Sequence, residues 1–343
     1  MRRAIATLSI ALSAVLVAVP AWEWTPQKSG VSARLRGVSA VTEDIAWASG
    51  SGSTILRTED GGTTWTKLPE PTPDRLDYRD IDAISATTAY ALSIGNGAAS
   101  RIFKTTDAGL TWTEQYRASE EKIFLDAMTF SDANRGIVLG DSIDGRFFFM
   151  TTDNGGARWI PVPVDRLPAA LPNEGFFAAS GTNVAVLGDQ IWIGTGAAAR
   201  ARVLRSADRG VTWTVAETPL AAGPSAGIYS IAFRDNQHGI VVGGDYAKEA
   251  EAVDNCAITS DGGATWTLIR GLSGFRSVVA PVPGTPATWI AIGPRGSDVS
   301  VDDGRTWAPI DGPGFDTFSF VRGKAIGWAS GARGAIAKLK TSN

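Results

Sequence analysis

An acidic, glycine-rich octet ending in tryptophan recurs along the chain and limits the fold more than any other feature. Five ungapped copies occur, at Thr58–Trp65 (TEDGGTTW), Thr105–Trp112, Ser206–Trp213, Thr259–Trp266 and Ser300–Trp307. A sixth copy, Thr151–Trp159, is interpreted as carrying one extra residue before its tryptophan. The six tryptophans are 41 to 54 residues apart. Periods of this size are typical of repeat arrays such as propeller blades.

Short apolar segments that end in glycine form a second repeat, one before each octet. Seven are found, at 46–50, 90–95, 136–140, 184–188, 239–243, 289–293 and 327–331. Each is interpreted as the second strand of a blade. Seven such strands against six octets leave the last module without an octet and therefore without its outer strand.

The N-terminal end of the mature chain offers the missing strand. Glu23-Trp24-Thr25 matches the Trp-Thr pair formed by the last residue of four octets and the threonine that follows it. A strand from one end of the chain that completes the last blade would remove the free sheet edges. The sequence therefore predicts an all-β fold, a seven-bladed β-propeller over residues 22–343, closed by its N-terminal strand.

The octet itself is interpreted as a turn. Asp60 can accept hydrogen bonds from backbone amides of its own turn, and Gly62 permits a positive φ. A calcium loop is a poor alternative, because the twelfth position counted from Asp60 is Pro71 instead of a carboxylate. We assign six structural aspartates: Asp60, Asp107, Asp153, Asp208, Asp261 and Asp302. No metal site is expected.

The octets resemble the Asp-box of BNR-type propellers. Combined with the glycine-ended strands and the Trp-Thr tails, they resemble the photosystem II assembly-factor branch (Ycf48/HCF136-like) across the whole mature chain. This resemblance implies that each octet joins the third and fourth strands of a blade. It also implies binding or assembly of another protein. No feature of the chain indicates a photosynthetic host, so the partner is not carried over.

The first residues predict export. Met1-Arg2-Arg3 precedes an apolar run, Ala4–Ala21, and Val19-Pro20-Ala21 offers a cleavage site. We expect a signal peptide over residues 1–21, a periplasmic or extracellular protein, and no membrane insertion after cleavage. A retained N-terminal anchor is the alternative. The formal net charge of −3 argues against nucleic acid as a partner.

Histidine and cysteine chemistry is not indicated. The single histidine, His238, falls where another repeat carries Arg135 in a hairpin turn. The single cysteine, Cys256, takes the place of Ile55, Ile102 and Val203 in other repeats, so we expect it to face a core. No cofactor is expected.

Charged side chains recur at the end of the propeller opposite the octet turns, around the central channel. Function in propellers gathers in such loops. The predicted binding residues of this channel face are Arg36, Arg79, Asp80, Asn96, Arg101, Asp126, Asp141, Asp144, Arg146, Glu174, Tyr229, Asp245, Tyr246, Lys248, Glu249, Arg276, Arg295 and Arg333. A long loop is also expected over 188–202, where Ile191-Trp192-Ile193 would be exposed to a ligand.

Three functions remain open. The first is a monomeric binding or assembly factor for a protein of the cell envelope. The second is a glycan-active hydrolase or lyase, for which Asp126, Asp141 and Glu174 are the catalytic candidates, since such enzymes use paired carboxyl groups. Leu35-Arg36-Gly37-Val38 lacks the proline of the sialidase motif. A redox enzyme is the weakest, because no dinucleotide-binding motif occurs.

Overall fold

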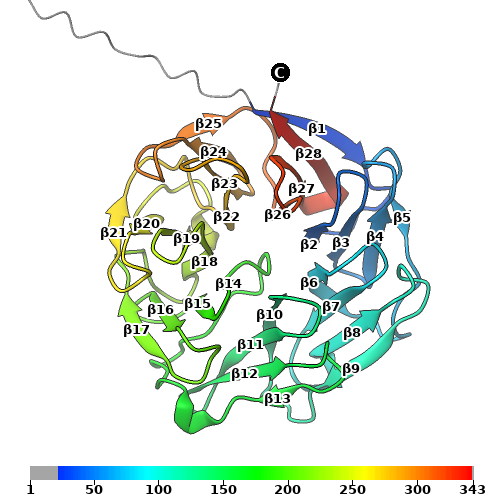
Figure 1. Cartoon of the computed structure of the whole chain (residues 1–343), viewed down its shortest axis with the longest axis horizontal. Helices are drawn as coiled ribbons and strands as arrows, with labels where there is room; N and C mark the ends of the chain where they lie inside the picture. Colours follow the sequence, from blue (N-terminus) through cyan, green and yellow to red (C-terminus); the bar gives the residue numbers. More distant parts are fainter. Residues whose placement is uncertain (1–21, 342–343) are drawn as a thin grey trace, which may run out of the picture.

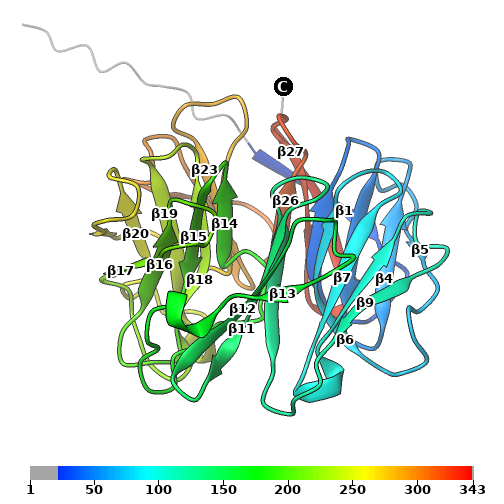
Figure 2. The same ribbon diagram turned by 60° about the horizontal axis from the view of Figure 1, so that its bottom comes forward.

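Seven four-stranded antiparallel sheets surround a central axis in the computed structural model, which describes residues 22–341 (Figure 1). The all-β, seven-bladed prediction is confirmed. The turned view shows inner strands such as β14 and β18 around the central space (Figure 2). The predicted signal peptide, residues 1–21, lies outside the described residues. No helix among residues 22–341 is long and apolar enough to cross a bilayer.

The blades follow one another along the chain, each running from an inner first strand to an outer fourth strand. Blade 1 contains β2 (Leu35–Ala40), β3 (Ala46–Gly50), β4 (Thr54–Thr58) and β5 (Thr66–Lys67). Blade 2 contains β6 (Asp77–Ala83), β7 (Ala89–Ile94), β8 (Arg101–Thr105) and β9 (Thr113–Arg117). Blade 3 contains β10 (Leu125–Phe130), β11 (Gly136–Ile143), β12 (Arg146–Thr152) and β13 (Ile160–Pro161).

The remaining blades continue this order. Blade 4 contains β14 (Val184–Leu187), β15 (Gln190–Gly194), β16 (Arg202–Ser206) and β17 (Thr214–Glu217). Blade 5 contains β18 (Ala226–Phe233), β19 (Gly239–Asp245), β20 (Cys256–Thr259) and β21 (Thr267–Ile269). Blade 6 contains β22 (Val278–Pro281), β23 (Trp289–Gly293), β24 (Gly296–Ser300) and β25 (Ala308–Ile310). Four 3₁₀ turns lie between strands, η1 (Gly97–Ala99), η2 (Val164–Arg166), η3 (Tyr246–Lys248) and η4 (Ala332–Gly334).

Blade 7 joins the two ends of the chain. Its strands are β26 (Thr317–Phe320), β27 (Ile326–Ser330), β28 (Ala335–Thr341) and, as the outer strand, β1 (Trp22–Lys28). β1 pairs antiparallel with β28 over its full length, and the two lie side by side in Figure 1. The ring of Trp24 lies 4.7 Å from that of Phe315. The predicted closure by the N-terminal strand is confirmed.

The octets form the turns between third and fourth strands. The carboxylate of Asp302 accepts hydrogen bonds from the Thr306 amide at 2.8 Å, the Thr306 hydroxyl at 2.7 Å and the Ser300 hydroxyl at 2.8 Å. Burial on its own would raise the pKa of Asp302, but these bonds together hold the pKa below its ordinary value. Four other octets have the same bonds, centred on Asp60, Asp107, Asp208 and Asp261.

The assignment in the sixth octet was wrong by one residue. Asn154, not Asp153, accepts hydrogen bonds from the Thr152 hydroxyl at 3.0 Å and the Arg158 amide at 3.0 Å. Residues 152–159 therefore form an ungapped octet with asparagine in place of aspartate. An amide oxygen accepts the same bonds as a carboxylate oxygen, which explains why the turn is kept.

Blade 4 was also assigned in the wrong register. Residues 184–187 form the inner strand β14, and the second strand is β15, Gln190–Gly194. Trp192 is therefore fully buried between blades, where its ring stacks 3.8 Å from Phe233. The expectation that Ile191-Trp192-Ile193 is an exposed loop was wrong, because two consecutive apolar segments were read as one strand and a loop.

Side chains of inner strands connect each blade to the next. The Asp80 carboxylate accepts a hydrogen bond from the Met128 amide of blade 3 at 2.7 Å, and Asp82 accepts one from Phe130 at 2.8 Å. The Ser39, Ser230 and Ser319 hydroxyls accept from the amides of Ala83, Val279 and Ala40 in the same way. Unpaired amides of the inner strands are thereby satisfied, as buried donors require.

Removing the closing strand tests the closure. Deletion of residues 22–28 exposes the edge of β28 and the apolar surface around Phe315 and Phe318, which β1 covers. We expect a lower melting temperature with a single cooperative transition, because the blades form one ring. Adding the peptide 22–28 in trans should restore part of the loss. A truncated protein that melts like the parent would contradict the closure.

The octet turns are tested at Asp302. Replacement by alanine removes three hydrogen bonds, and we expect the melting temperature to fall by a few degrees. Asp302→Asn is the matched control, because Asn154 fills the equivalent position in blade 3. We expect the asparagine variant to lie closer to the parent than the alanine variant in thermal denaturation. Equal losses in the two variants would show that the acceptor oxygen is not what stabilises the turn.

Asp80 makes stability dependent on pH. Burial raises its pKa to about 7 in the folded protein, above about 3.9 for an unfolded chain. The folded state thus binds the proton more tightly than the unfolded chain. Protonated Asp80 therefore adds to the free energy of unfolding in full below pH 4, and this stabilisation is lost between about pH 4 and 7. Asp80→Asn, which keeps an acceptor for the Met128 amide, should become more stable relative to the parent from pH 5 to pH 8. We expect a gain on the order of 2–4 kcal/mol, measured by chemical denaturation. Asp311→Asn, at an exposed site, is the control and should show no such trend.

Candidate channel-mouth binding site

The channel mouth is a cavity of about 470 Å³ at the end of the ring opposite the octet turns. In each blade, the connection from the previous blade and the hairpin between second and third strands meet at this end. The cavity is lined by Arg34, Arg36, Arg79, Ile94, Phe124, Asp126, Asp141, Phe176–Ala179, Tyr229, Tyr246, Glu249, Phe275, Ser277, Pro294 and Asp316. It therefore combines both signs of charge with an aromatic wall.

The floor of the mouth is made by a segment that interrupts the first strand of blade 4. Val184 pairs with Ile193, so an uninterrupted strand would place Gly181 opposite Gly196. Gly175 takes that place instead, and six extra residues bulge out before β14. We call residues 177–183 the channel segment; in Figure 1 a loop beside β14 reaches toward the centre of the ring.

Hydrogen bonds to distant blades fix the channel segment. The Ser180 hydroxyl donates to the Ser277 carbonyl at 2.8 Å, and the Ser180 carbonyl accepts from the Thr317 hydroxyl at 3.1 Å. The Thr182 hydroxyl donates to the Ser230 hydroxyl at 2.8 Å. Blades 5, 6 and 7 thus hold a segment that belongs to blade 4.

Aromatic rings form one wall above this segment. Phe177 stacks on Tyr229 with ring centroids 4.1 Å apart and planes 4° apart. Tyr229 is buried, and its hydroxyl donates to the Ser225 carbonyl at 3.0 Å. Tyr246, from η3, meets both rings edge-on and is 53% exposed. Of the three rings, Tyr246 is therefore the one most available to a ligand at the mouth.

Three arginines form the opposite wall. Arg34 makes a two-pronged ion pair with Asp316, at 2.7 and 2.8 Å. Arg79 pairs with Asp77 at 2.9 Å and donates to the Ala178 carbonyl of the channel segment at 2.8 Å. Among the described residues, Arg36 has neither a hydrogen bond nor an ion pair. Burial, and then the neighbouring Arg79, lower its pKa to about 10, so it remains charged at neutral pH.

Two carboxyl groups lie at the same mouth. Burial raises the pKa of Asp126 well above its ordinary value, and Asp141 adds to the effect. Burial also raises the pKa of Asp141, although its Oδ1 accepts a hydrogen bond from the Phe176 amide at 3.0 Å. Oδ2 of Asp126 is buried without a hydrogen-bond partner. The pair therefore holds less negative charge than two free aspartates would.

The structure brings seven of the predicted binding residues to the cavity wall: Arg36, Arg79, Asp126, Asp141, Tyr229, Tyr246 and Glu249. Others lie on surrounding loops at the same end. Asp144 pairs with Lys122, Lys248 with Glu251, and Asp245 caps η3. Asn96 contacts the Glu121 carbonyl, and Arg146, Arg295 and Arg333 lie on hairpins between second and third strands.

Four predicted residues are buried within the protein instead. Glu174 is bound by Arg202 and by the Thr195 hydroxyl, Arg276 by Asp298, and Arg101 by Asp74. The Asp80 carboxylate accepts a hydrogen bond from the Met128 amide of blade 3. Their side chains stabilise loops or blades and do not face the cavity. Sequence position alone could not distinguish a charge that faces a ligand from one that faces an ion-pair partner.

Arg34 and Phe177 were missed by the sequence analysis. A signal for the channel segment was present, because the tryptophan spacing from Trp159 to Trp213 is 54 residues, against 47 for the two preceding intervals. The extra length marks the insertion. Among residues 22–341 no cluster of three or more His, Cys, Asp or Glu could hold a metal ion. Cys256 is fully buried, and its pKa is raised to about 12 by burial.

Solved structures share this fold. One described as YCF48 bound to D1 peptide has a TM-score of 0.66 at 16% identity, covering 95% of this chain and 100% of that one. YCF48 from Cyanidioschyzon merolae has a TM-score of 0.64 at 17% identity, covering 93% and 98%. The GH74 xyloglucanase from Xanthomonas campestris has 0.62 at 16% identity, covering 92% of this chain and 53% of its own.

Sequence comparison gives the family. No curated protein sequence matches the chain significantly. The family described as the DUF6242 beta propeller domain matches residues 22–272, which include the first five blades, the outer strand of blade 7 and most of the channel-mouth residues. The chain is therefore a member of the DUF6242 beta propeller domain family.

Proposed function

We propose that this protein binds a segment of another protein at the channel mouth. The observation that carries the proposal is the unpaired guanidinium of Arg36 inside a cavity with an aromatic wall. A half-buried cation without a partner has lost part of its hydration, so an incoming carboxylate gains a charge-assisted hydrogen bond there. A negatively charged segment with apolar neighbours is the ligand that suits both walls.

The related fold supports this choice. The structure described as YCF48 bound to D1 peptide has a propeller with a protein peptide as its ligand. At 16% identity the likeness supports the type of ligand and not its sequence. The partner of the present protein is therefore defined by chemistry, as a segment bearing a carboxylate that can reach Arg36 and an apolar side chain that can reach Tyr246.

We also infer that the protein is exported and acts as a monomer in the cell envelope. The apolar run from Ala4 to Ala21 after two arginines supports export. N-terminal sequencing of the protein from an envelope fraction would test this, and a protein that begins at Met1 in the cytoplasmic fraction would contradict it. Light scattering would test the monomer, and a stable dimer at micromolar concentration would contradict it.

Capture of the partner tests the binding function. The mature protein serves as bait in an envelope extract, beside Arg36→Gln and, as a matched control, Arg117→Gln. Arg117 is an exposed arginine on β9, paired with Glu114. We expect the parent and Arg117→Gln to recover the same protein in near-equal amount, and Arg36→Gln to bind it about 10- to 100-fold more weakly. Equal binding by Arg36→Gln with an unchanged melting temperature would contradict the proposed site.

Glycan chemistry is the second candidate, and the Asp126–Asp141 pair favours it. Burial raises the pKa of both carboxyl groups, and a carboxyl group with a raised pKa can act as the general acid of glycoside hydrolysis. Glu174, the third catalytic candidate, is buried in an ion pair with Arg202 and does not line the mouth. Hydrolysis of any member of a glycan panel by the parent, abolished in Asp126→Asn and Asp141→Asn, would support this function. Unchanged activity in both variants would exclude the pair as its source.

A further inference from the structure

One position in the second strand of each blade faces the next blade, and its residue type divides the blades into two groups. It is aromatic in four blades (Trp47, Tyr90, Trp192 and Trp328) and isoleucine in three (Ile137, Ile240 and Ile290). Its partner lies on the third strand, directly before the octet in the six blades that have one. In the aromatic group this partner is basic, and in the isoleucine group it is Thr151, Ile258 or Val299.

In the aromatic group the ring fills the gap between blades. A Cβ on Gly109 of the next octet would lie 3.1 Å from Trp47, and one on Gly156 would lie 3.1 Å from Tyr90. A cation lies over the ring in three of the four, with Arg57 5.1 Å from Trp47, Lys104 5.1 Å from Tyr90 and Lys338 4.4 Å from Trp328. Ring and cation together close these interfaces.

Between blades 3 and 4 this filling is absent. The nearest atoms to a Cβ on Gly210 belong to Trp213 and Ile191, and not to Ile137. The Trp213 indole donates to the Gly210 carbonyl of its own turn at 3.1 Å. A cavity of about 270 Å³ remains open between the blades. The corresponding gap between blades 5 and 6, beside Ile240, is smaller at about 120 Å³.

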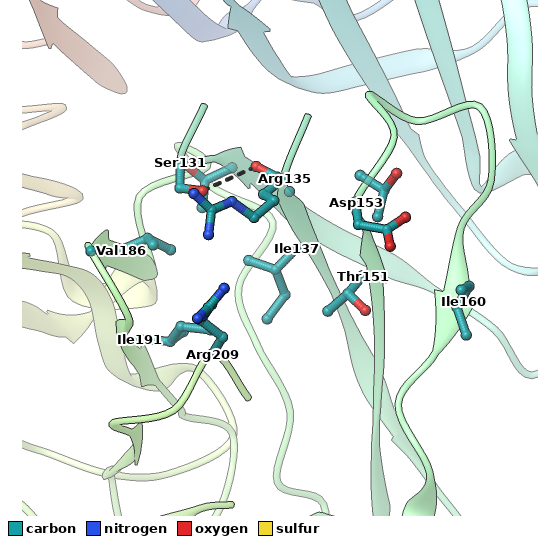
Figure 3. A pocket seen from close by; sticks show the side chains of 13 residues that line it. Ser131, Arg135, Ile137, Thr151, Asp153, Ile160, Val186, Ile191 and Arg209 are labelled. Atoms are coloured by element: carbon teal, nitrogen blue, oxygen red, sulfur yellow. Dashed lines mark hydrogen bonds between the residues drawn. The ribbon is translucent and has the colours of Figure 1, made fainter. Parts of the chain in front are cut away.

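The blade 3–4 pocket is lined by apolar side chains, hydroxyl side chains, two arginines and one carboxylate, Asp153. Figure 3 shows Ile137 in the middle, with Arg135, Arg209 and Ile191 toward blade 4 and Asp153 on the other side. Arg135 and Arg209 are half-exposed and pair with Asp132 and Asp189 at 2.7 and 3.0 Å. The pocket thus offers an apolar floor and two guanidinium groups, but no ring.

We propose that the blade 3–4 pocket binds an aromatic side chain of a protein partner. An incoming ring would occupy the place that Trp47 or Tyr90 fills at other interfaces. The negative face of its π system complements a guanidinium, as the cations over Trp47, Tyr90 and Trp328 show in this same protein. The pocket lies on the octet side of the ring, so this site is independent of the channel mouth.

The surroundings favour a side chain of a protein over a free aromatic molecule. Ile160, in the pocket wall, is 42% exposed, and Leu187, next to the lining residues Val186 and Gly188, is 40% exposed. Exposed apolar side chains around a pocket are what the neighbours of an anchoring aromatic residue cover at a protein interface. A free aromatic molecule confined to the pocket would leave Leu187 in water.

Methyl NMR of the mature protein, with labelled isoleucine, leucine and valine, tests the proposal. The probes are N-acetyl-tryptophanamide, N-acetyl-leucinamide and an acetylated pentapeptide, Gly-Leu-Trp-Leu-Gly-amide. We expect saturable shifts of the Ile137 and Ile191 methyls with the tryptophan probes and none with the leucine probe. The pentapeptide should bind at least threefold more tightly than N-acetyl-tryptophanamide. Equal affinity of the two would overturn the assignment to a protein partner.

Two variants make the test specific. Ile137→Trp with Thr151→Arg rebuilds the ring and cation of the other blades, and should abolish the shifts of the Ile191 methyl with both tryptophan probes. Arg209→Gln leaves the pocket empty and should weaken binding of the tryptophan probes about two- to fivefold, with Arg117→Gln as the matched control. Shifts that persist in the filled variant, or that are equal in Arg209→Gln and the parent, would overturn the proposal. So would the absence of saturable shifts in the parent at millimolar probe.

Discussion

The pairing of β1 with β28 is the interaction on which the rest of the structure depends. Seven residues from each end of the chain form it, over Trp22–Lys28 and Ala335–Thr341. An open row of blades would leave apolar faces and unpaired backbone groups at both ends, and both are costly in water. Because this pairing joins the first and last strands of the ring, blade 7 has its fourth strand only when the ring is closed.

Closure also fixes how tightly neighbouring blades approach, and the blades satisfy that constraint in two ways. Aromatic residues such as Trp47 and Trp192 fill the wedge between blades, and the next octet presents a glycine to them. Where isoleucine takes this position, the tryptophan of the next octet donates a hydrogen bond from its indole to the glycine carbonyl of its own turn, as Trp213 and Trp307 do. Between blades 3 and 4 the second way leaves a cavity of about 270 Å³, whereas between blades 5 and 6 Ile240 packs against Gly304 and the gap is smaller.

The two ends of the ring carry different chemistry for a topological reason. One end has octet turns, whose side-chain oxygens are occupied by the turn itself. The other end has blade connections and long hairpins, which are free to vary. The channel segment arises there, and it brings Phe177 against Tyr229 and Ala178 against Arg79. Arg34 and Arg79 are neutralised by Asp316 and Asp77, which leaves the charge of Arg36 available.

The sequence by itself determined the number of blades, the octet turns and the closing strand, because each depends on local patterns or on a count of repeats. The sequence did not reveal that Asn154 replaces the octet aspartate, because the neighbouring Asp153 also fits the pattern if one extra residue is allowed before Trp159. Only the tertiary structure decided that Glu174 and Arg276 are fully buried and Arg36 is half-buried, because the repeat pattern predicts all three near the start of the first strand of a blade. Burial depends on which side chains from other blades arrive nearby, and a single repeat does not contain that information.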